Sequence, residues 1–193
     1  MKCLARTLLR CVMAFDSAQH HRRSIRLRNY DYRLPGAYFV TVVTVNGDCL
    51  FEDAALRSIV ERSWLAIPRH CVHAALDAWV VMPNHIHGIV VIHEAPASSV
   101  HGGTASLGTM VGNFKSVTTR RINRVRRMPA APVWQRNYYE RIVRHGRELD
   151  RIRAYIGANP LRWQLDRENP GRIADRDEWN ADEDLWFTTV PPS

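Results

Sequence analysis

The chain has 193 residues, enough for one well-buried core but fewer than the roughly 250 residues of a typical TIM-barrel enzyme. Its formal net charge is +8, and all of its 27 basic residues except Lys2 and Lys115 are arginine, which favours partners that carry phosphate. The four cysteines show no CxxC spacing, and no apolar stretch suits a signal peptide or a membrane span, so we expect a reduced, cytoplasmic protein without structural disulfides.

The first half of the chain predicts a strand, a helix and a hairpin. Residues 38–45 are almost all β-branched or aromatic, which is typical of a core strand. Asp53 can cap a helix whose apolar residues keep helical spacing until Pro68. Residues 76–81 and 86–92 then predict two strands that are joined closely enough for an antiparallel hairpin.

The second half predicts a helix, a short strand and a further helix. A helix follows the polar loop 95–106 and carries apolar positions from Leu107 to Val125. A short strand is expected around residues 133–139, and a helix from near Arg147 to Asn159 and Pro160. The expected organisation is a basic extension over residues 1–28, a catalytic domain over 29–166 and an acidic tail over 167–193.

This order of elements contains the split βαβ arrangement of a ferredoxin-like sandwich. The predicted class is therefore α+β, with a single antiparallel sheet and helices packed on one face. The other face of the sheet would then be free for a substrate.

Two histidines, His85 and His87, lie at the start of the second hairpin strand. Residues i and i+2 of a strand point to the same face, so both imidazoles could bind one divalent cation. The triplet also occurs by chance, and neutral histidines can be satisfied by hydrogen bonds at a sheet edge. Ile89 stands where a histidine-triad hydrolase would need a third alternating histidine.

Basic residues gather on the helix that begins at Leu107 and just after it. Basic groups interleaved with aromatic residues suit single-stranded nucleic acid, although Trp134 can equally belong to the core and the basic side can be a solvated helix face. The candidate DNA-binding residues are Lys115, Arg120, Arg121, Arg124, Arg127 and Arg136.

Several ordered motifs resemble one known family, the HUH single-tyrosine transposases, and within it the REP-associated tyrosine transposases. The resemblance spans roughly residues 22 to 170. It is carried by Arg22–Leu27, Tyr38–Thr41, Val81–Gly88, Phe114–Ser116, Trp134–Glu140 and Tyr155–Pro160.

The resemblance implies a metal-dependent nuclease and strand transferase that acts on single-stranded or hairpin-forming DNA. In such an enzyme His85 and His87 would hold Mg²⁺ or Mn²⁺, and Asn159 would be the third ligand. Tyr155 would attack the phosphorus, leaving a 5′-phosphotyrosine and a free 3′-hydroxyl whose attack can reverse the reaction. The enzyme would act as a monomer or homodimer, associated with the nucleoid when bound to DNA.

Other interpretations of these residues stay open in the sequence. A helix tyrosine usually packs its ring, and Tyr138 and Tyr139 are rival nucleophiles. Pro160 disfavours helical geometry at Asn159, which could then cap the helix instead of binding metal. The chain could also be a non-cleaving module that binds single-stranded nucleic acid, or a metal hydrolase that uses activated water.

Overall fold

The computed structural model describes residues 30–94, 105–166 and 168–171. The predicted extension over 1–28 and all of the predicted tail except residues 168–171 lie outside these ranges. The elements, in chain order, are β1 (Gly36–Val43), η1 (Val45–Gly47), η2 (Leu50–Glu52), α1 (Ala54–Leu65), α2 (Ile67–His70), β2 (Ala74–Val81), β3 (His85–Ile92), α3 (Leu107–Arg126), β4 (Tyr139–Val143), α4 (Gly146–Ala158) and η3 (Asn159–Leu165).

The four strands form one antiparallel sheet in the order β2-β3-β1-β4. This order places the first strand between the third and the fourth, as the split βαβ arrangement requires. The predicted α+β class and the antiparallel ferredoxin-like sheet are therefore confirmed. None of the helices in the described ranges is long and apolar enough to cross a membrane.

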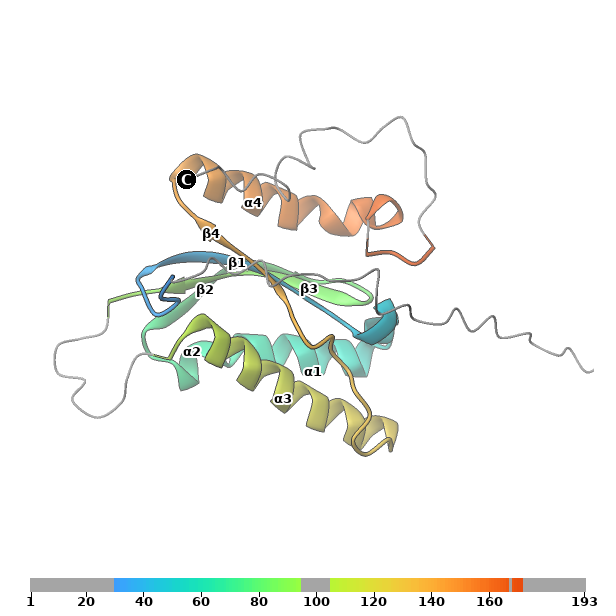
Figure 1. Ribbon diagram of the computed structural model, residues 1–193. Helices are drawn as coiled ribbons and strands as arrows, with labels where there is room; N and C mark the ends of the chain where they lie inside the picture. The colour runs from blue at the N-terminus through green and yellow to red at the C-terminus, as the bar shows by residue number, and fades with distance from the viewer. Residues whose placement is uncertain (1–29, 95–104, 167, 172–193) are drawn as a thin grey trace, which may run out of the picture.

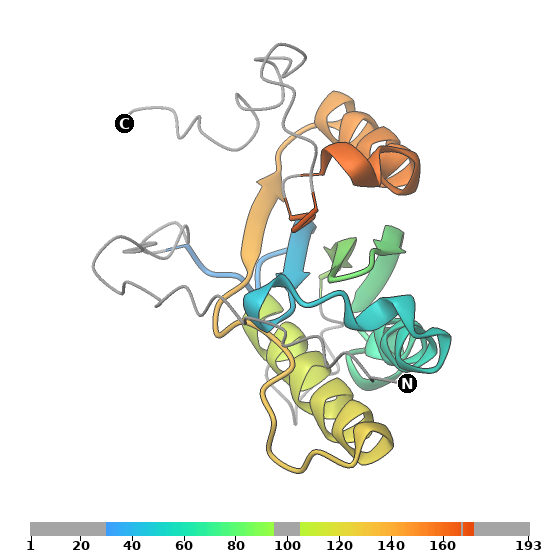
Figure 2. The same ribbon diagram turned by 90° about the vertical axis from the view of Figure 1, so that its right-hand side faces the viewer.

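The helices cover both faces of the sheet. Figure 1 shows α1, α2 and α3 on one face and α4 alone on the other. The expectation that helices occupy one face holds for α1 to α3, but α4 covers the face that was expected to be free. Its apolar stripe, Ile152 and Ile156, packs against Phe39 of β1 and Ile89 of β3. In Figure 2, turned by 90°, α4 and α3 still lie on opposite sides of the strands.

The main core lies between the sheet and the α1–α3 layer. Alternate residues of β3, including Ile86 and Val90, point into this core, where they meet Trp64 of α1 and Phe114 of α3. Asp53 caps α1 as predicted, since its Oδ1 accepts hydrogen bonds from the first amides of the helix. The intervening residues of β3 point to the α4 face, and these include both histidines.

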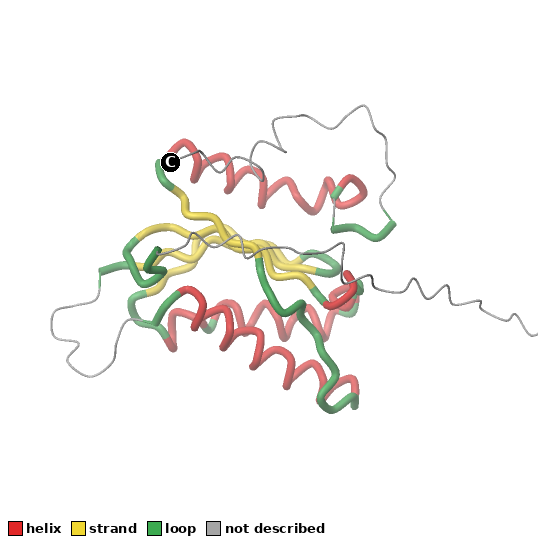
Figure 3. Tube along the Cα trace, in the orientation of Figure 1, coloured by secondary structure: helices red, strands yellow, loops and turns green. Residues whose placement is uncertain are grey.

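The last strand begins later than the sequence predicted. The segment 133–138 forms only an isolated bridge between Thr44 and Trp134, and β4 starts at Tyr139. The carbonyls of residues 135 and 136 both accept hydrogen bonds from Lys115 Nζ, at 2.6 and 2.9 Å. Consecutive carbonyls of a regular strand point in opposite directions, so the backbone here is not that of a regular strand. Figure 3 shows the resulting loop running from the end of α3 up to the sheet.

Helix α4 is held at both edges of the sheet. Near its start, the buried Glu148 accepts a hydrogen bond from Arg141 Nε of β4 at 2.6 Å. Farther along, Arg153 donates to both carboxylate oxygens of Asp77 on β2, at 3.0 and 2.6 Å. The helix therefore crosses the sheet from one edge strand to the other, above the histidines of β3.

Candidate active site

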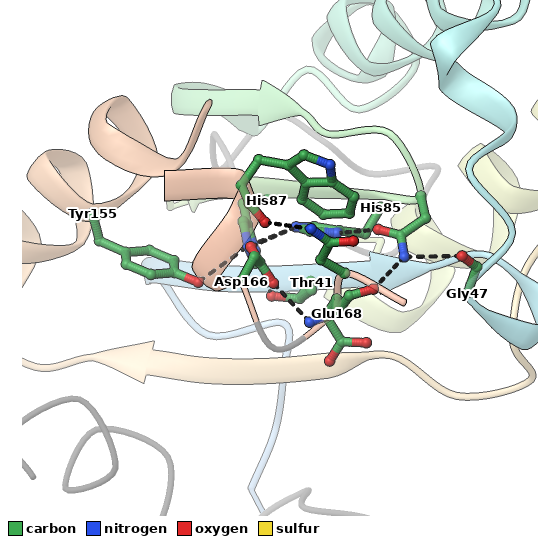
Figure 4. Close-up of polar contacts among 10 residues, drawn as sticks. Thr41, Gly47, His85, His87, Tyr155, Asp166 and Glu168 are labelled. Carbon is green, nitrogen blue, oxygen red and sulfur yellow. Dashed lines mark hydrogen bonds and ion pairs between the residues drawn. The ribbon is translucent and has the colours of Figure 1, made fainter. Parts of the chain in front are cut away.

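The two histidines lie side by side on the face of β3 that α4 covers. His85 is fully buried and His87 is 3% exposed, and their Nε2 atoms are 2.9 Å apart. Figure 4 shows both rings directed toward one point between β3 and α4. The prediction that the two imidazoles project together from the strand is confirmed by this geometry.

The other ring nitrogen of each histidine contacts a neighbouring side chain. His85 Nδ1 lies 2.7 Å from Asn84 Oδ1, and His87 Nδ1 lies 2.8 Å from Thr41 Oγ1 on β1. The amide nitrogen of Asn84 donates to the carbonyls of Gly47 and Glu168, which leaves its oxygen to accept from His85. Asn84 therefore favours the tautomer of His85 whose Nε2 carries a lone pair.

This arrangement fits a divalent cation. Ligands at about 2.1 Å from an octahedral ion are roughly 3.0 Å apart along an edge, close to the 2.9 Å between the two Nε2 atoms. Nδ1–H bonds to oxygen acceptors are the usual support for metal-binding imidazoles, and Asn84 and Thr41 can accept them.

A carboxylate that was not among the predicted ligands completes the group. Asp166 Oδ2 lies 3.8 Å from His85 Nε2, and ligand atoms of His85, His87 and Asp166 all lie within 4.8 Å of one another. In the sequence, Asp166 marked only the end of the predicted catalytic domain. It reaches the histidines because η3 turns the chain back over the site, and no local pattern in the sequence signals that turn.

Tyr155 is the tyrosine that lies beside the histidines. Its hydroxyl is 3.3 Å from His87 Nε2, and the two ring centroids are 5.2 Å apart. The ring also packs edge-on against Phe39. Of the rival tyrosines, Tyr139 lies on β4 against Phe39, and Tyr138 packs against the main core.

Asn159 follows Tyr155 by one helical turn. Its backbone is helical, with φ −56° and ψ −43°, so the following Pro160 does not displace Asn159 from helical geometry. The side chain is 4% exposed, and its Oδ1 has no hydrogen-bond partner within the described part of the chain. A buried amide oxygen of this kind suits a hard cation, because an unpaired buried acceptor is costly.

The predicted DNA-binding residues do not gather around the histidines. They belong to α3 or follow it, and α3 lies across the sheet from Tyr155. Lys115, Arg120 and Arg136 line one pocket, whereas Arg121 donates a hydrogen bond to Ser63 of α1 at 3.2 Å. Trp134 is buried in the main core, 6% exposed, as one interpretation of the sequence expected.

Comparison with known proteins places the chain among relatives. A Haemophilus influenzae protein of uncharacterized function is 33% identical over 174 residues, a match that covers 79% of this chain and 96% of that protein. The chain belongs to the family of that protein. No protein-family model matches the chain.

Among solved structures, the chain resembles a REP-associated tyrosine transposase bound to a REP hairpin. The TM-score is 0.51 at 18% sequence identity, and the match covers 72% of this chain and 73% of that chain. At this identity the likeness shows a shared fold. The strand order and the antiparallel sheet described above are therefore features of a fold that a known transposase also adopts.

Proposed function

We propose that this protein is a metal-dependent tyrosine transposase that cleaves and rejoins single-stranded DNA. The observation that carries the proposal is the position of the Tyr155 hydroxyl, 3.3 Å from His87 Nε2 in a group of potential metal ligands. A phenol at this place could attack a phosphate bound against the histidines. The fold shared with the REP-associated tyrosine transposase supports the same assignment.

The metal would be held by His85 and His87, with Asp166 or Asn159 as an oxygen ligand. When bound, Mg²⁺ or Mn²⁺ would polarise the scissile phosphate and stabilise negative charge on the leaving oxygen. Asn84 and Thr41 would orient the two imidazoles. The burial of both rings would exclude water that competes with the tyrosine.

In the proposed reaction, the Tyr155 oxygen attacks phosphorus and the phenol proton passes to solvent. The bond from phosphorus to the 3′ oxygen breaks, and that oxygen takes up a proton. The products are a 5′-phosphotyrosine and a free 3′-hydroxyl. Because the phosphoester bond is conserved, a second 3′-hydroxyl can attack the phosphotyrosine and join two strands without a nucleotide cofactor.

The experiment that tests this function is a denaturing gel with labelled single-stranded hairpin DNA from the flank of the gene. The protein is incubated with Mn²⁺ or with EDTA, and Tyr155→Phe is compared with Tyr138→Phe and Tyr139→Phe. We expect a covalent adduct with Mn²⁺ for the wild type and both control variants, and none for Tyr155→Phe.

Three other outcomes would contradict the proposal. An adduct with Tyr155→Phe would assign the nucleophile elsewhere. Free DNA ends without any adduct would indicate a hydrolase that uses activated water. Binding of DNA without cleavage in either metal condition would indicate a non-cleaving module.

A further inference from the structure

A pocket of about 470 Å³ lies between α3 and the segment that precedes β4. Among the residues that the structure describes, its lining includes three basic side chains and no carboxylate. Hydroxyl and amide groups complete the polar part of the wall. The polar lining residues are Lys115, Ser116, Thr119, Arg120, Gln135 and Arg136. Cations together with hydroxyl donors, and no competing anion, are the chemistry that recognises phosphate.

One wall of the pocket is fixed by contacts that do not involve a ligand. Lys115 Nζ donates to the carbonyls of Gln135 and Arg136, which leaves one ammonium proton available. The neighbouring Trp134 is buried and donates from Nε1 to Thr118 Oγ1 at 2.8 Å. The pocket is therefore formed before any ligand binds. Burial also lowers the pKa of Lys115, and a bound anion would favour its charged form.

The pocket wall and the histidines are attached to the same end of β1. Val43 pairs with His85 on one side, and its carbonyl accepts from the amide of Gln135 at 2.9 Å on the other. The pocket opens in the α3 layer, whereas Tyr155 lies in the α4 layer. A flexible chain that passes around this end of the sheet could contact both.

We propose that this pocket binds a backbone phosphate of the DNA strand whose scissile phosphate lies at Tyr155, so that the strand bends around the end of β1. The proposal rests on the proposed function for its substrate. It also divides the basic residues predicted from the sequence, since Lys115, Arg120 and Arg136 contact the DNA in the pocket and Arg121 supports the packing of α3 on α1.

The first test measures binding of single-stranded DNA in EDTA, where no cleavage can occur. Arg120→Gln, Arg136→Gln and the double variant are compared with Arg62→Gln. Arg62 is an exposed arginine on α1 that contacts Ser58 four residues earlier, as Arg120 contacts Ser116. All single variants remove one positive charge, so a difference between them reports position and not net charge.

We expect the double variant to bind DNA about tenfold more weakly at low salt. The slope of log K against log salt concentration should become shallower by roughly one for each phosphate that is no longer neutralised. Arg62→Gln should keep the affinity within about twofold and the slope of the wild type. Equal effects of the pocket variants and Arg62→Gln would overturn the proposal. Because both pocket arginines are exposed, unchanged melting temperatures would verify folding.

The second test places the phosphate along the strand. Single phosphates are replaced one at a time by neutral methylphosphonates, and each oligonucleotide is measured with the wild type and the double variant. At one position, the methylphosphonate should weaken binding to the wild type but not to the double variant. No such position, or DNA binding that is unaffected by inorganic phosphate at the concentration that saturates the pocket, would contradict a DNA site.

These results are separable from the test of the proposed function. DNA binding through the pocket without adduct formation would support the pocket proposal and contradict the proposed tyrosine chemistry. If all pocket variants form the adduct and bind DNA with wild-type affinity, the tyrosine chemistry is supported and the pocket proposal is contradicted.

Discussion

Gly88 lies next to His87 on β3 and faces the main core. A Cβ atom at this position would lie 2.3 Å from Cζ2 and 2.9 Å from Cε2 of Trp64, whereas ordinary carbon contacts are about 3.5–4.0 Å. The Trp64 ring is fully buried and packs edge-on against Phe114, with ring centroids 5.3 Å apart. In Gly88→Ala the ring would have to move by more than about 1 Å in a close-packed interior.

Overpacking of a core typically costs about 1–3 kcal/mol, and we expect Gly88→Ala at the upper end because the new atom is fixed to the backbone. For a chain of this size, about 3 kcal/mol corresponds to a fall in melting temperature of roughly 6–12 °C. Thermal and urea denaturation followed by circular dichroism would measure it.

The matched control is Gly112→Ala on α3, because nothing lies within 4 Å of its added Cβ. That change should stabilise the helix by up to about 1 kcal/mol. Adding Trp64→Leu to Gly88→Ala should cost less than the sum of the two single changes, since the smaller side chain removes the clash. A melting temperature for Gly88→Ala equal to that of the wild type would refute the reasoning.

Three further predictions concern the site and its supports. Thr41→Val removes the oxygen that lies 2.8 Å from His87 Nδ1. The affinity for Mn²⁺, measured by titration with electron paramagnetic resonance, should fall about tenfold. An unchanged affinity would mean that Thr41 does not orient the ring. Burial tends to raise the pKa of Glu148, but a backbone amide and the guanidinium of Arg141 outweigh it and hold this pKa below its ordinary value of 4.5. The stabilisation from Glu148 is therefore present above pH 4.5 and is lost as the pH falls through the lower pKa that Glu148 has in the folded protein. Glu148→Gln should be less stable than the wild type at pH 7 and should lose less stability on acidification. The midpoints of urea denaturation at each pH would measure both differences. Since Tyr155 and His87 of one chain are 3.3 Å apart, mixing Tyr155→Phe with His87→Ala should not restore adduct formation, and recovered activity would show that the groups are shared between chains.

Local sequence patterns predicted most elements because each pattern reflects a preference of its own segment. The apolar run around the histidines predicted β3 and its neighbour β2, and the Asp53 cap located the start of α1. The apolar stripe of α4 was also evident. A stripe of this kind fits either face of a sheet, so it could not reveal that α4 covers the second face.

The missed features depend on contacts between distant segments. The segment before β4 is held by Lys115, on another element, which binds the carbonyls of residues 135 and 136. Asp166 approaches His85 only after η3 reverses the chain. Asn84 lies between the two predicted hairpin strands, where asparagine is common for backbone reasons alone. The structure shows both ends of its amide in use, one of them beside a candidate ligand.

The docking of α4 through a small apolar cluster has a consequence for motion. Phe39, Ile89, Ile152 and Ile156 form a cluster separate from the larger core that holds α1 and α3 to the sheet. Segments with few buried contacts open locally at lower free energy than the whole protein unfolds. We therefore expect amide hydrogens of α4 to exchange with deuterium faster than those of α1 and α3. Each such opening separates Tyr155 from His87 while the strand that carries the histidines stays folded.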